Sequence, residues 1–117
     1  MKEQIQEIEK YAKENNVPII EKESICYIMK YIKEYNVKNI LEIGSAIGYS
    51  AILMASSNVN TTVTTIERDE TRYMECLKNI KKCGLDKKIN VVYQDALDVY
   101  TSIAAILGIP NRGVKVG

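Results

Sequence analysis

Apolar residues recur at helical spacing in the first third of the chain. Ile5, Ile8 and Ala12 share one face of residues 3–15, and this spacing predicts an amphipathic helix. The proline of the following "NNVPII" ends the helix, because proline cannot continue the helical hydrogen-bond ladder. A second amphipathic helix is predicted over residues 21–35. Its apolar positions are Ile25, Ile28, Met29 and Ile32.

Three short runs of aliphatic and β-branched residues alternate with further helical segments. The predicted strands span residues 39–43, 61–67 and 89–93. The predicted helices after them span 48–57, the segment from a capping Asp69 to a terminating Gly84, and 96–107. Such alternation is typical of βαβ units with a parallel sheet. Right-handed crossovers place the strands in the order 3-2-1, so the predicted fold is α/β, one half of a doubly wound sheet with flanking helices.

Length and composition indicate one ordinary globular domain. The chain has 117 residues, of which 46% are hydrophobic and 26% are charged. No apolar run approaches the roughly 20 residues needed to span a membrane. The N-terminal "MKEQIQEIEK" lacks the apolar centre of a signal peptide. We therefore expect a cytoplasmic protein without membrane contact.

Histidine and cysteine, which often act in catalysis or bind metals, are absent or few in this chain. The chain has no histidine, which removes the commonest general base and metal ligand. Cys26, Cys76 and Cys83 form no C-x-x-C pair, so we expect free thiols. The net charge of +1 predicts no nucleic-acid surface. A local lysine cluster is better explained as a solvated helix end near the negative pole of the dipole. Its members are Lys78, Lys81, Lys82, Lys87 and Lys88.

A glycine-bearing turn follows the first predicted strand, in "LEIGSAIGYS". Parallel sheets bind ligands beyond the carboxyl ends of their strands, where Glu42, Gly44 and Gly48 are expected to lie. A dinucleotide fingerprint would require glycine at positions 46 and 49, which are alanine and tyrosine. The remaining E-x-G-x-x-x-G pattern is weak on its own.

Acidic residues also end the second and third predicted strands. Glu67 follows Gly44 at about the distance expected for a ribose-binding acid, although it can also be a surface residue paired with Arg68. Asp95 can accept a hydrogen bond from an exocyclic amine while Ala96 meets a ring nitrogen; it can also cap the next helix. Three acids at one sheet edge favour S-adenosylmethionine as the ligand.

Several blocks together resemble a known family: "VPIIEK", "ILEIGSAIGYSAILMA", "TTIERDETRY", "NIKKCGL" and "YQDALDV". Over residues 5–99 the chain resembles the class I, metal-dependent O-methyltransferases. The bacterial branch that is similar to tRNA 5-hydroxyuridine methyltransferases, related to caffeoyl-CoA and catechol O-methyltransferases, gives the strongest resemblance. The implied fold is the N-terminal half of a Rossmann-like class I methyltransferase.

The resemblance implies a role for each matching residue. Glu42, Gly44 and Ser45 would border the methionine moiety of S-adenosylmethionine, and Ser50 would bind its carboxylate. Glu67 would hold the ribose, and Asp95 with Ala96 would frame the adenine. Ile20 stands where the family often has a methionine that packs over the cofactor, a substitution that conserves volume.

The end of the chain departs from the family. Members of the family are longer, and their fourth strand ends in a stretch like "IFIDAAK", whose aspartate binds cofactor and divalent metal. After Val99 this chain reads "YTSIAAILGIPNRGVKVG", which contains no acid. We therefore expect a cofactor-binding half-domain over residues 1–99, a divergent tail over 100–117, and no ligands for the family's Mg²⁺.

These expectations leave several functions open. The first is methyl transfer from S-adenosylmethionine to a hydroxyl acceptor, either a small molecule or tRNA 5-hydroxyuridine. The sequence assigns no catalytic residue to this reaction and leaves open whether this chain can catalyse it. The second is a non-catalytic module that binds S-adenosylmethionine or S-adenosylhomocysteine. The third is a homodimer formed through the open edge of the first strand. An NAD(P) module is a more distant alternative, suggested by Arg68 beside Glu67.

Overall fold

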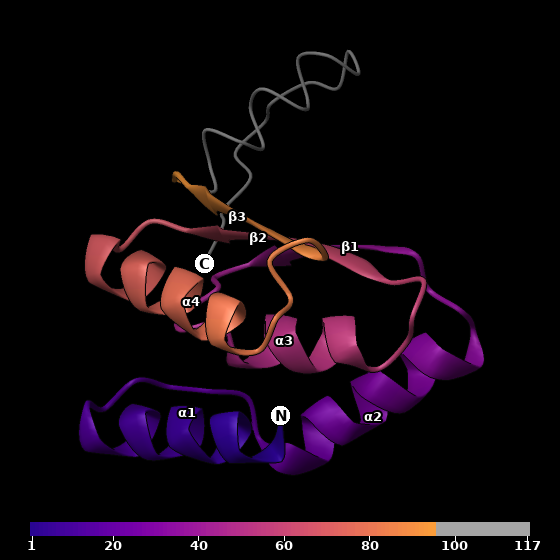
Figure 1. The fold of residues 1–117 in the computed structure, drawn as a ribbon, viewed down its shortest axis with the longest axis horizontal. Helices are drawn as coiled ribbons and strands as arrows, with labels where there is room; N and C mark the ends of the chain where they lie inside the picture. Colours follow the sequence, from indigo (N-terminus) through magenta and orange to yellow (C-terminus); the bar gives the residue numbers. More distant parts are fainter. Residues whose placement is uncertain (96–117) are drawn as a thin grey trace, which may run out of the picture.

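The computed structural model describes residues 1–95 and contains four helices and three strands in that range (Figure 1). In chain order they are α1 (Lys2–Glu14), α2 (Lys22–Glu34), β1 (Asn39–Ile43), α3 (Tyr49–Ser56), β2 (Thr62–Glu67), α4 (Glu70–Lys82) and β3 (Ile89–Tyr93). Every predicted element before residue 95 is confirmed, with ends that agree within two residues. The predicted helix over 96–107, the tail over 100–117 and Ala96 lie outside the described residues.

The three strands form one parallel sheet with β2 in the middle. Glu42 of β1 lies opposite Thr65 of β2, and Glu67 of β2 lies opposite Tyr93 of β3. The predicted strand order 3-2-1 is this same sheet counted from its other edge. Because the strands are parallel and in register, the carboxyl ends of all three strands lie side by side at the same end of the sheet.

The described helices form two layers on one face of the sheet (Figure 1). α3 and α4 pack directly on the strands, and α1 and α2 pack on the outside of α3 and α4. The core lies between these layers and contains Ile25 and Ile32 of α2, Ile52 of α3 and Val63 of β2. The apolar faces predicted for α1 and α2 therefore point inward.

Side chains of β1 alternate between the two faces of the sheet. Ile40 and Glu42 are half-buried toward the helices, whereas Leu41 and Ile43 on the opposite face are 55% and 48% exposed. Residues 1–95 place no helix on that opposite face. The described part of the chain thus has a sheet that is covered on one side.

Local sequence signals explain where α4 begins and ends. The Asp69 side chain accepts a hydrogen bond from the backbone N–H of Arg72 (2.9 Å), as predicted for an N-cap. Gly84 adopts the predicted left-handed conformation after the helix. Cys76 and Ile80 of α4 are buried, whereas Leu77 of the same helix is exposed and the polar Asn79 is buried.

Lys88, assigned above to a solvated cluster, has a structural role. Its Nζ donates hydrogen bonds to the carbonyl oxygens of Ala55 (2.5 Å) and Asn58 (2.9 Å), at and just beyond the end of α3. A cation there satisfies carbonyl groups that the helix leaves without partners and opposes the helix dipole. None of the helices within residues 1–95 is long and apolar enough to cross a membrane.

Candidate functional site

The turn between β1 and α3 is built from residues in the left-handed region. Gly44 has φ +89°, Ala46 has φ +47° and Gly48 has φ +88°. The backbone N–H groups of Gly44 and Ser45 both donate to the carbonyl oxygen of Ile66, at 2.8 and 3.0 Å. These bonds continue the pairing of β1 with β2 into the turn and fix the path of the loop.

Glu67 is the second anchor of this loop. Its Oε1 accepts a hydrogen bond from the Ala46 N–H (2.8 Å), and its Oε2 accepts from the N–H groups of Arg68 (3.1 Å) and Asp69 (3.0 Å). The residue is only 7% exposed. Glu67 therefore ties the loop to the end of β2. The alternative left open by the sequence, a surface glutamate paired with Arg68, is wrong because the residue is buried.

Gly48 packs against α4 and lies outside the cavity described below. A Cβ at this position would lie 3.0 Å from the Cys76 Sγ, and the positive φ also disfavours any other residue. Asn79 of the same helix donates a hydrogen bond to the Ile47 carbonyl oxygen (2.8 Å). Contact with α4 thus fixes the exit of the loop into α3.

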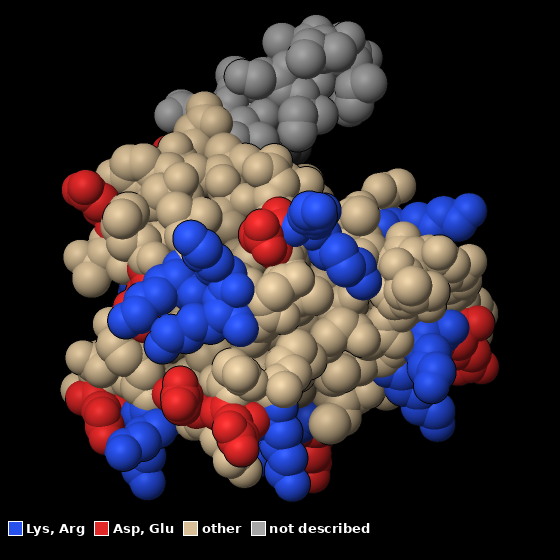
Figure 2. All heavy atoms as spheres, viewed as in Figure 1, with Lys and Arg blue, Asp and Glu red and all other residues tan. Residues whose placement is uncertain are grey.

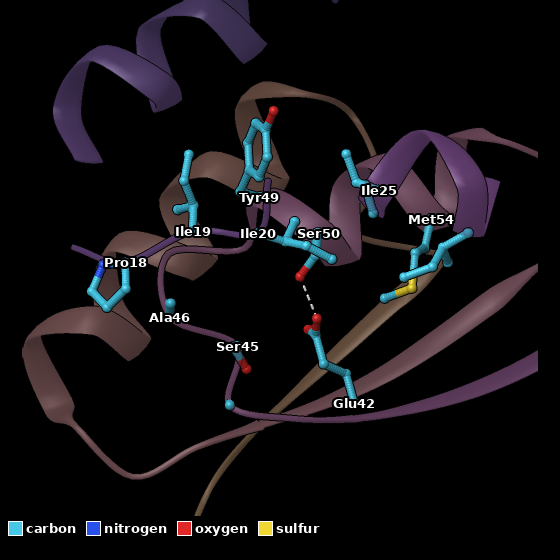
Figure 3. Close-up of a pocket in the computed structure, with 12 residues that line it drawn as sticks. Pro18, Ile19, Ile20, Ile25, Glu42, Ser45, Ala46, Tyr49, Ser50 and Met54 are labelled. Carbon is cyan, nitrogen blue, oxygen red and sulfur yellow. Dashed lines mark hydrogen bonds between the residues drawn. The ribbon is translucent and has the colours of Figure 1, made fainter. Parts of the chain in front are cut away.

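A chain of hydroxyl groups surrounds Glu42. Thr65 Oγ1 donates to Glu42 Oε1 (2.6 Å), and Ser45 Oγ lies 2.6 Å from Thr65 Oγ1. The Ser50 hydroxyl donates to Glu42 Oε2, and Figure 3 shows these two side chains pointing toward each other. Glu42 therefore has a hydroxyl donor on each carboxylate oxygen.

Opposing effects act on the charge of Glu42. Burial raises its pKa, because a carboxylate loses hydration when it is covered. The hydrogen bonds from Ser50 and Thr65 lower the pKa, and the nearby Glu67 carboxylate raises it. The net direction is upward, so Glu42 is a partly buried carboxyl group with a perturbed pKa at the end of β1.

A cavity of about 260 Å³ opens beside Glu42. Its walls come from the end of β1 and the β1–α3 turn, from α3, from α2 and from the segment that joins α1 to α2 (Figure 3). The lining residues are Pro18, Ile19, Ile20, Ile25, Ile28, Glu42, Gly44, Ser45, Ala46, Tyr49, Ser50 and Met54. One wall is therefore aliphatic and the other carries a carboxylate and hydroxyl groups.

The structure brings together five of the nine predicted site residues. Ile20, Glu42, Gly44, Ser45 and Ser50 all line the cavity. Of the others, Gly48 packs behind the loop and Glu67 supports it from β2.

Asp95 is exposed, two residues beyond β3, and does not line the cavity. Ala96, as noted, is outside the described residues.

Two residues at the site escaped sequence analysis. Thr65 gave no signal beyond its β propensity, although strand alternation places it on the same face as Glu67. Tyr49 lines the cavity, and its hydroxyl donates to Glu9 Oε2 of α1 (2.8 Å). Lys22 Nζ lies 3.6 Å from the same oxygen. Burial and the Glu9 carboxylate raise the pKa of Tyr49 to about 12, so its hydroxyl is a donor at every physiological pH.

Within residues 1–95, no three histidine, cysteine or acidic side chains are grouped so that they could hold a metal ion. The described site thus offers a carboxylate, hydroxyl groups and an open glycine backbone. These groups can bind a zwitterionic ligand by hydrogen bonds and charge.

The comparisons with known proteins agree with this architecture. The sequence model of the family described as "O-methyltransferase" matches residues 1–106. Tapetum-specific methyltransferase 1 of Arabidopsis thaliana is 35% identical over 85 residues, which are 72% of this chain and 35% of that protein. The structure of a "putative caffeoyl-CoA O-methyltransferase" from Staphylococcus aureus superposes with a TM-score of 0.79 at 35% identity, covering 85% of this chain and 47% of that one.

An O-methyltransferase from Bacillus cereus, solved in complex with SAH (S-adenosylhomocysteine), has the same fold at 24% identity. Its TM-score is 0.78, and the match covers 88% of this chain and 48% of that one. This chain spans less than half the length of each of these relatives. The family model and the 35% identical relatives lead to one conclusion: the chain belongs to the O-methyltransferase family.

Proposed function

We propose that this chain is the S-adenosylmethionine-binding half of an O-methyltransferase. The observation that carries the proposal is the cavity at the end of β1, where the Glu42 carboxylate, the Ser50 hydroxyl and the Gly44 backbone meet. The methionine end of the cofactor has an ammonium group and a carboxylate. Glu42 would accept hydrogen bonds from the ammonium group, and the Ser50 hydroxyl would turn away from Glu42 when the ligand binds and donate its one hydrogen to the carboxylate.

The residues present fit this ligand. A Cβ at Gly44 would meet nothing within 4 Å, so the glycine leaves space for an approaching ligand. The cavity of about 260 Å³ is smaller than a typical pocket for a drug-sized ligand and suits one end of the cofactor. Ile20 would cover that end from the aliphatic wall, and the backbone of Ser45 would border it.

The nucleoside would extend from this cavity along the sheet edge. Three backbone N–H groups donate hydrogen bonds to the Glu67 carboxylate. Because a carboxylate has about four acceptor sites, one remains for a ribose hydroxyl. Asp95 and Ala96 would frame the adenine beyond β3. The Bacillus cereus relative, which has the same fold and was solved with S-adenosylhomocysteine, supports this choice of ligand.

We propose that the reaction is methyl transfer to a hydroxyl group, in the protein to which this half belongs. S-adenosylmethionine supplies the electrophilic methyl group, and Mg²⁺, which the family resemblance implies, would bind to residues other than those in the described range. The chain's own contribution would be to hold and orient the donor. The half-domain of residues 1–99, acting in the cytoplasm, is the unit that we assign to this task.

The acceptor is a small hydroxylated molecule or a tRNA hydroxyuridine. Figure 2 shows a group of basic side chains over α4 with acidic side chains close by. Lys82 Nζ, at the end of α4, lies 4.0 Å from Glu7, and Lys88, after α4, is bonded to backbone carbonyls at the end of α3. Lysines that are already paired contribute less to neutralising RNA phosphates, so this surface favours a small acceptor.

A second candidate function is self-association. β1 is an outer strand of the described sheet, and Leu41 and Ile43 are exposed on its uncovered face. A second copy that pairs with this edge would satisfy its open backbone N–H and C=O groups and would partly cover both side chains. Equilibrium ultracentrifugation would show a dimer that Leu41→Lys weakens, and a chain that stays monomeric at high concentration would exclude it.

Calorimetric titration with S-adenosylhomocysteine tests the main proposal. We expect one site, with affinity reduced roughly fivefold or more in Ser50→Ala, since a hydrogen bond is worth about 1 kcal/mol. Ser56→Ala is the matched control, because Ser56 is an exposed serine of the same helix that donates only to the Leu53 carbonyl. Absence of binding to the parent chain, or heat with NAD(P) alone, would contradict the proposal.

A further inference from the structure

Thr65 is a fully buried polar residue in the middle strand of the sheet, with 0% exposure. Its in-register neighbour on β1 is Glu42, so both side chains rise from the same face of the sheet toward α3. A buried hydroxyl must be hydrogen-bonded to be tolerated. Thr65 meets this demand entirely within the site, through Glu42 on one side and Ser45 on the other.

The number of hydroxyl hydrogens determines the direction of these hydrogen bonds. A hydroxyl group has one hydrogen to donate. Thr65 gives its hydrogen to Glu42 Oε1, so the 2.6 Å contact with Ser45 requires Ser45 to be the donor. The order is therefore Ser45 to Thr65 to Glu42, and this chain links the loop after β1 to the carboxylate beside the cavity.

We infer that Thr65 is a positioning residue, whose hydroxyl holds the Glu42 carboxylate in its ionised form and in the orientation that faces the cavity. The inference rests on the proposed function, because Glu42 is the group that would meet the ammonium of the ligand. Thr65 suits this role because a β-branched side chain has few χ1 rotamers, so its hydroxyl is already aligned.

Other titratable groups near Glu42 come from two elements. Glu67, at the end of β2, acts on Glu42 through its charge. The Cys76 thiol of α4 is also electrostatically coupled to Glu42, but burial and the two carboxylates raise its pKa to about 12. Cys76 therefore stays neutral, and Thr65 and Ser50 are the side chains that favour ionised Glu42.

The test compares Thr65→Val with Thr65→Ser in the 117-residue chain. Valine keeps the shape and removes the hydroxyl, whereas serine keeps the hydroxyl. Two quantities are measured: the pH titration of the Glu42 carboxyl carbon by NMR, assigned with Glu42→Gln, and the affinity for S-adenosylhomocysteine between pH 5 and pH 8. Thr62→Val, an exposed threonine of the same strand, is the control.

In Thr65→Val we expect the Glu42 midpoint to move to higher pH and the affinity at pH 7.5 to fall roughly tenfold, as for loss of a hydrogen bond to a charged group. Thr65→Ser and Thr62→Val should leave both quantities unchanged within about twofold. If valine prevents folding, Thr65→Ala removes the same hydroxyl without that steric demand. An unchanged Glu42 titration in the variant without the hydroxyl overturns the inference, even if the affinity falls.

The two failures are distinguishable. If the parent chain does not bind S-adenosylhomocysteine, the proposed function fails, and the NMR titration still decides whether Thr65 controls Glu42. If the parent chain binds and Thr65→Val binds equally well with the same pH dependence, the role of Thr65 fails and the proposed function stands.

Discussion

Gly48 and Cys76 are packed so closely that the cysteine sulfur lies 3.0 Å from the point where a Cβ of residue 48 would be. This contact joins the start of α3 to the middle of α4. The glycine is therefore required twice, once for its backbone angle of +88° and once for its missing side chain.

Gly48→Ala should lower the free energy of unfolding by about 2 kcal/mol or more, combining backbone strain with crowding. Urea denaturation measures this loss. Gly44→Ala is the matched control, because Gly44 has nearly the same φ and nothing within 4 Å of its Cβ position. Removal of the sulfur in Cys76→Ala should make the Gly48→Ala change less costly, and an unchanged cost would contradict the role of crowding.

Glu42→Gln should leave the free protein at least as stable as the parent at pH 7.5. Burial raises the pKa of Glu42 in the folded state, so folding takes up a proton between the unfolded and folded pKa values. The parent protein therefore loses stability as the pH rises through this window, and the variant lacks this loss. Denaturation at several pH values measures the difference, which should vanish in acid.

The same Glu42→Gln substitution should weaken binding of S-adenosylhomocysteine roughly tenfold or more, because it removes the charge opposite the ligand's ammonium. In the parent chain the affinity should fall as the pH drops through the pKa of Glu42, and the variant should show no such step. Calorimetry at pH 5 to 8 distinguishes these profiles. Equal affinities at pH 7.5 would place the ammonium elsewhere.

Glu67→Gln should behave in the opposite way and destabilise the free protein by about 1–3 kcal/mol. Glu67 receives three backbone N–H bonds, and an amide presents an NH₂ group to at least one of these donors. Denaturation with and without ligand measures the effect. A variant as stable as the parent would show that Glu67 does not anchor the loop.

The three thiols should react in the order of their exposure. Cys26 is exposed, Cys83 is half-buried with a pKa raised by burial, and Cys76 is fully buried with a pKa raised to about 12. A thiol reagent at pH 8 should modify Cys26 first and Cys76 only after unfolding. Mass spectrometry of peptides at successive times gives the order, and early modification of Cys76 would show that α4 opens readily.

Helices and strands of this fold were predictable because their signals are local. Ile25 and Ile32 repeat at helical spacing, and the β-branched "TTVTTIE" run favours an extended strand. The site was predictable only in part. The bond from Ala46 to Glu67 spans 21 residues and depends on an alanine with positive φ, which no local pattern indicates. The buried role of Thr65 depends in the same way on its register with Glu42.

The hydrogen bond between Tyr49 and Glu9 extends the site beyond its sequence motif. Tyr49 belongs to the glycine-turn segment, but its hydroxyl depends on an acceptor in the first helix, 40 residues earlier in the chain. A shortened protein that begins at α2 would contain every residue of the turn and still lack this acceptor. The smallest piece that can be excised with an intact cavity wall therefore includes α1, and any tag, fusion or cleavage site is best placed where it leaves Glu9 in position.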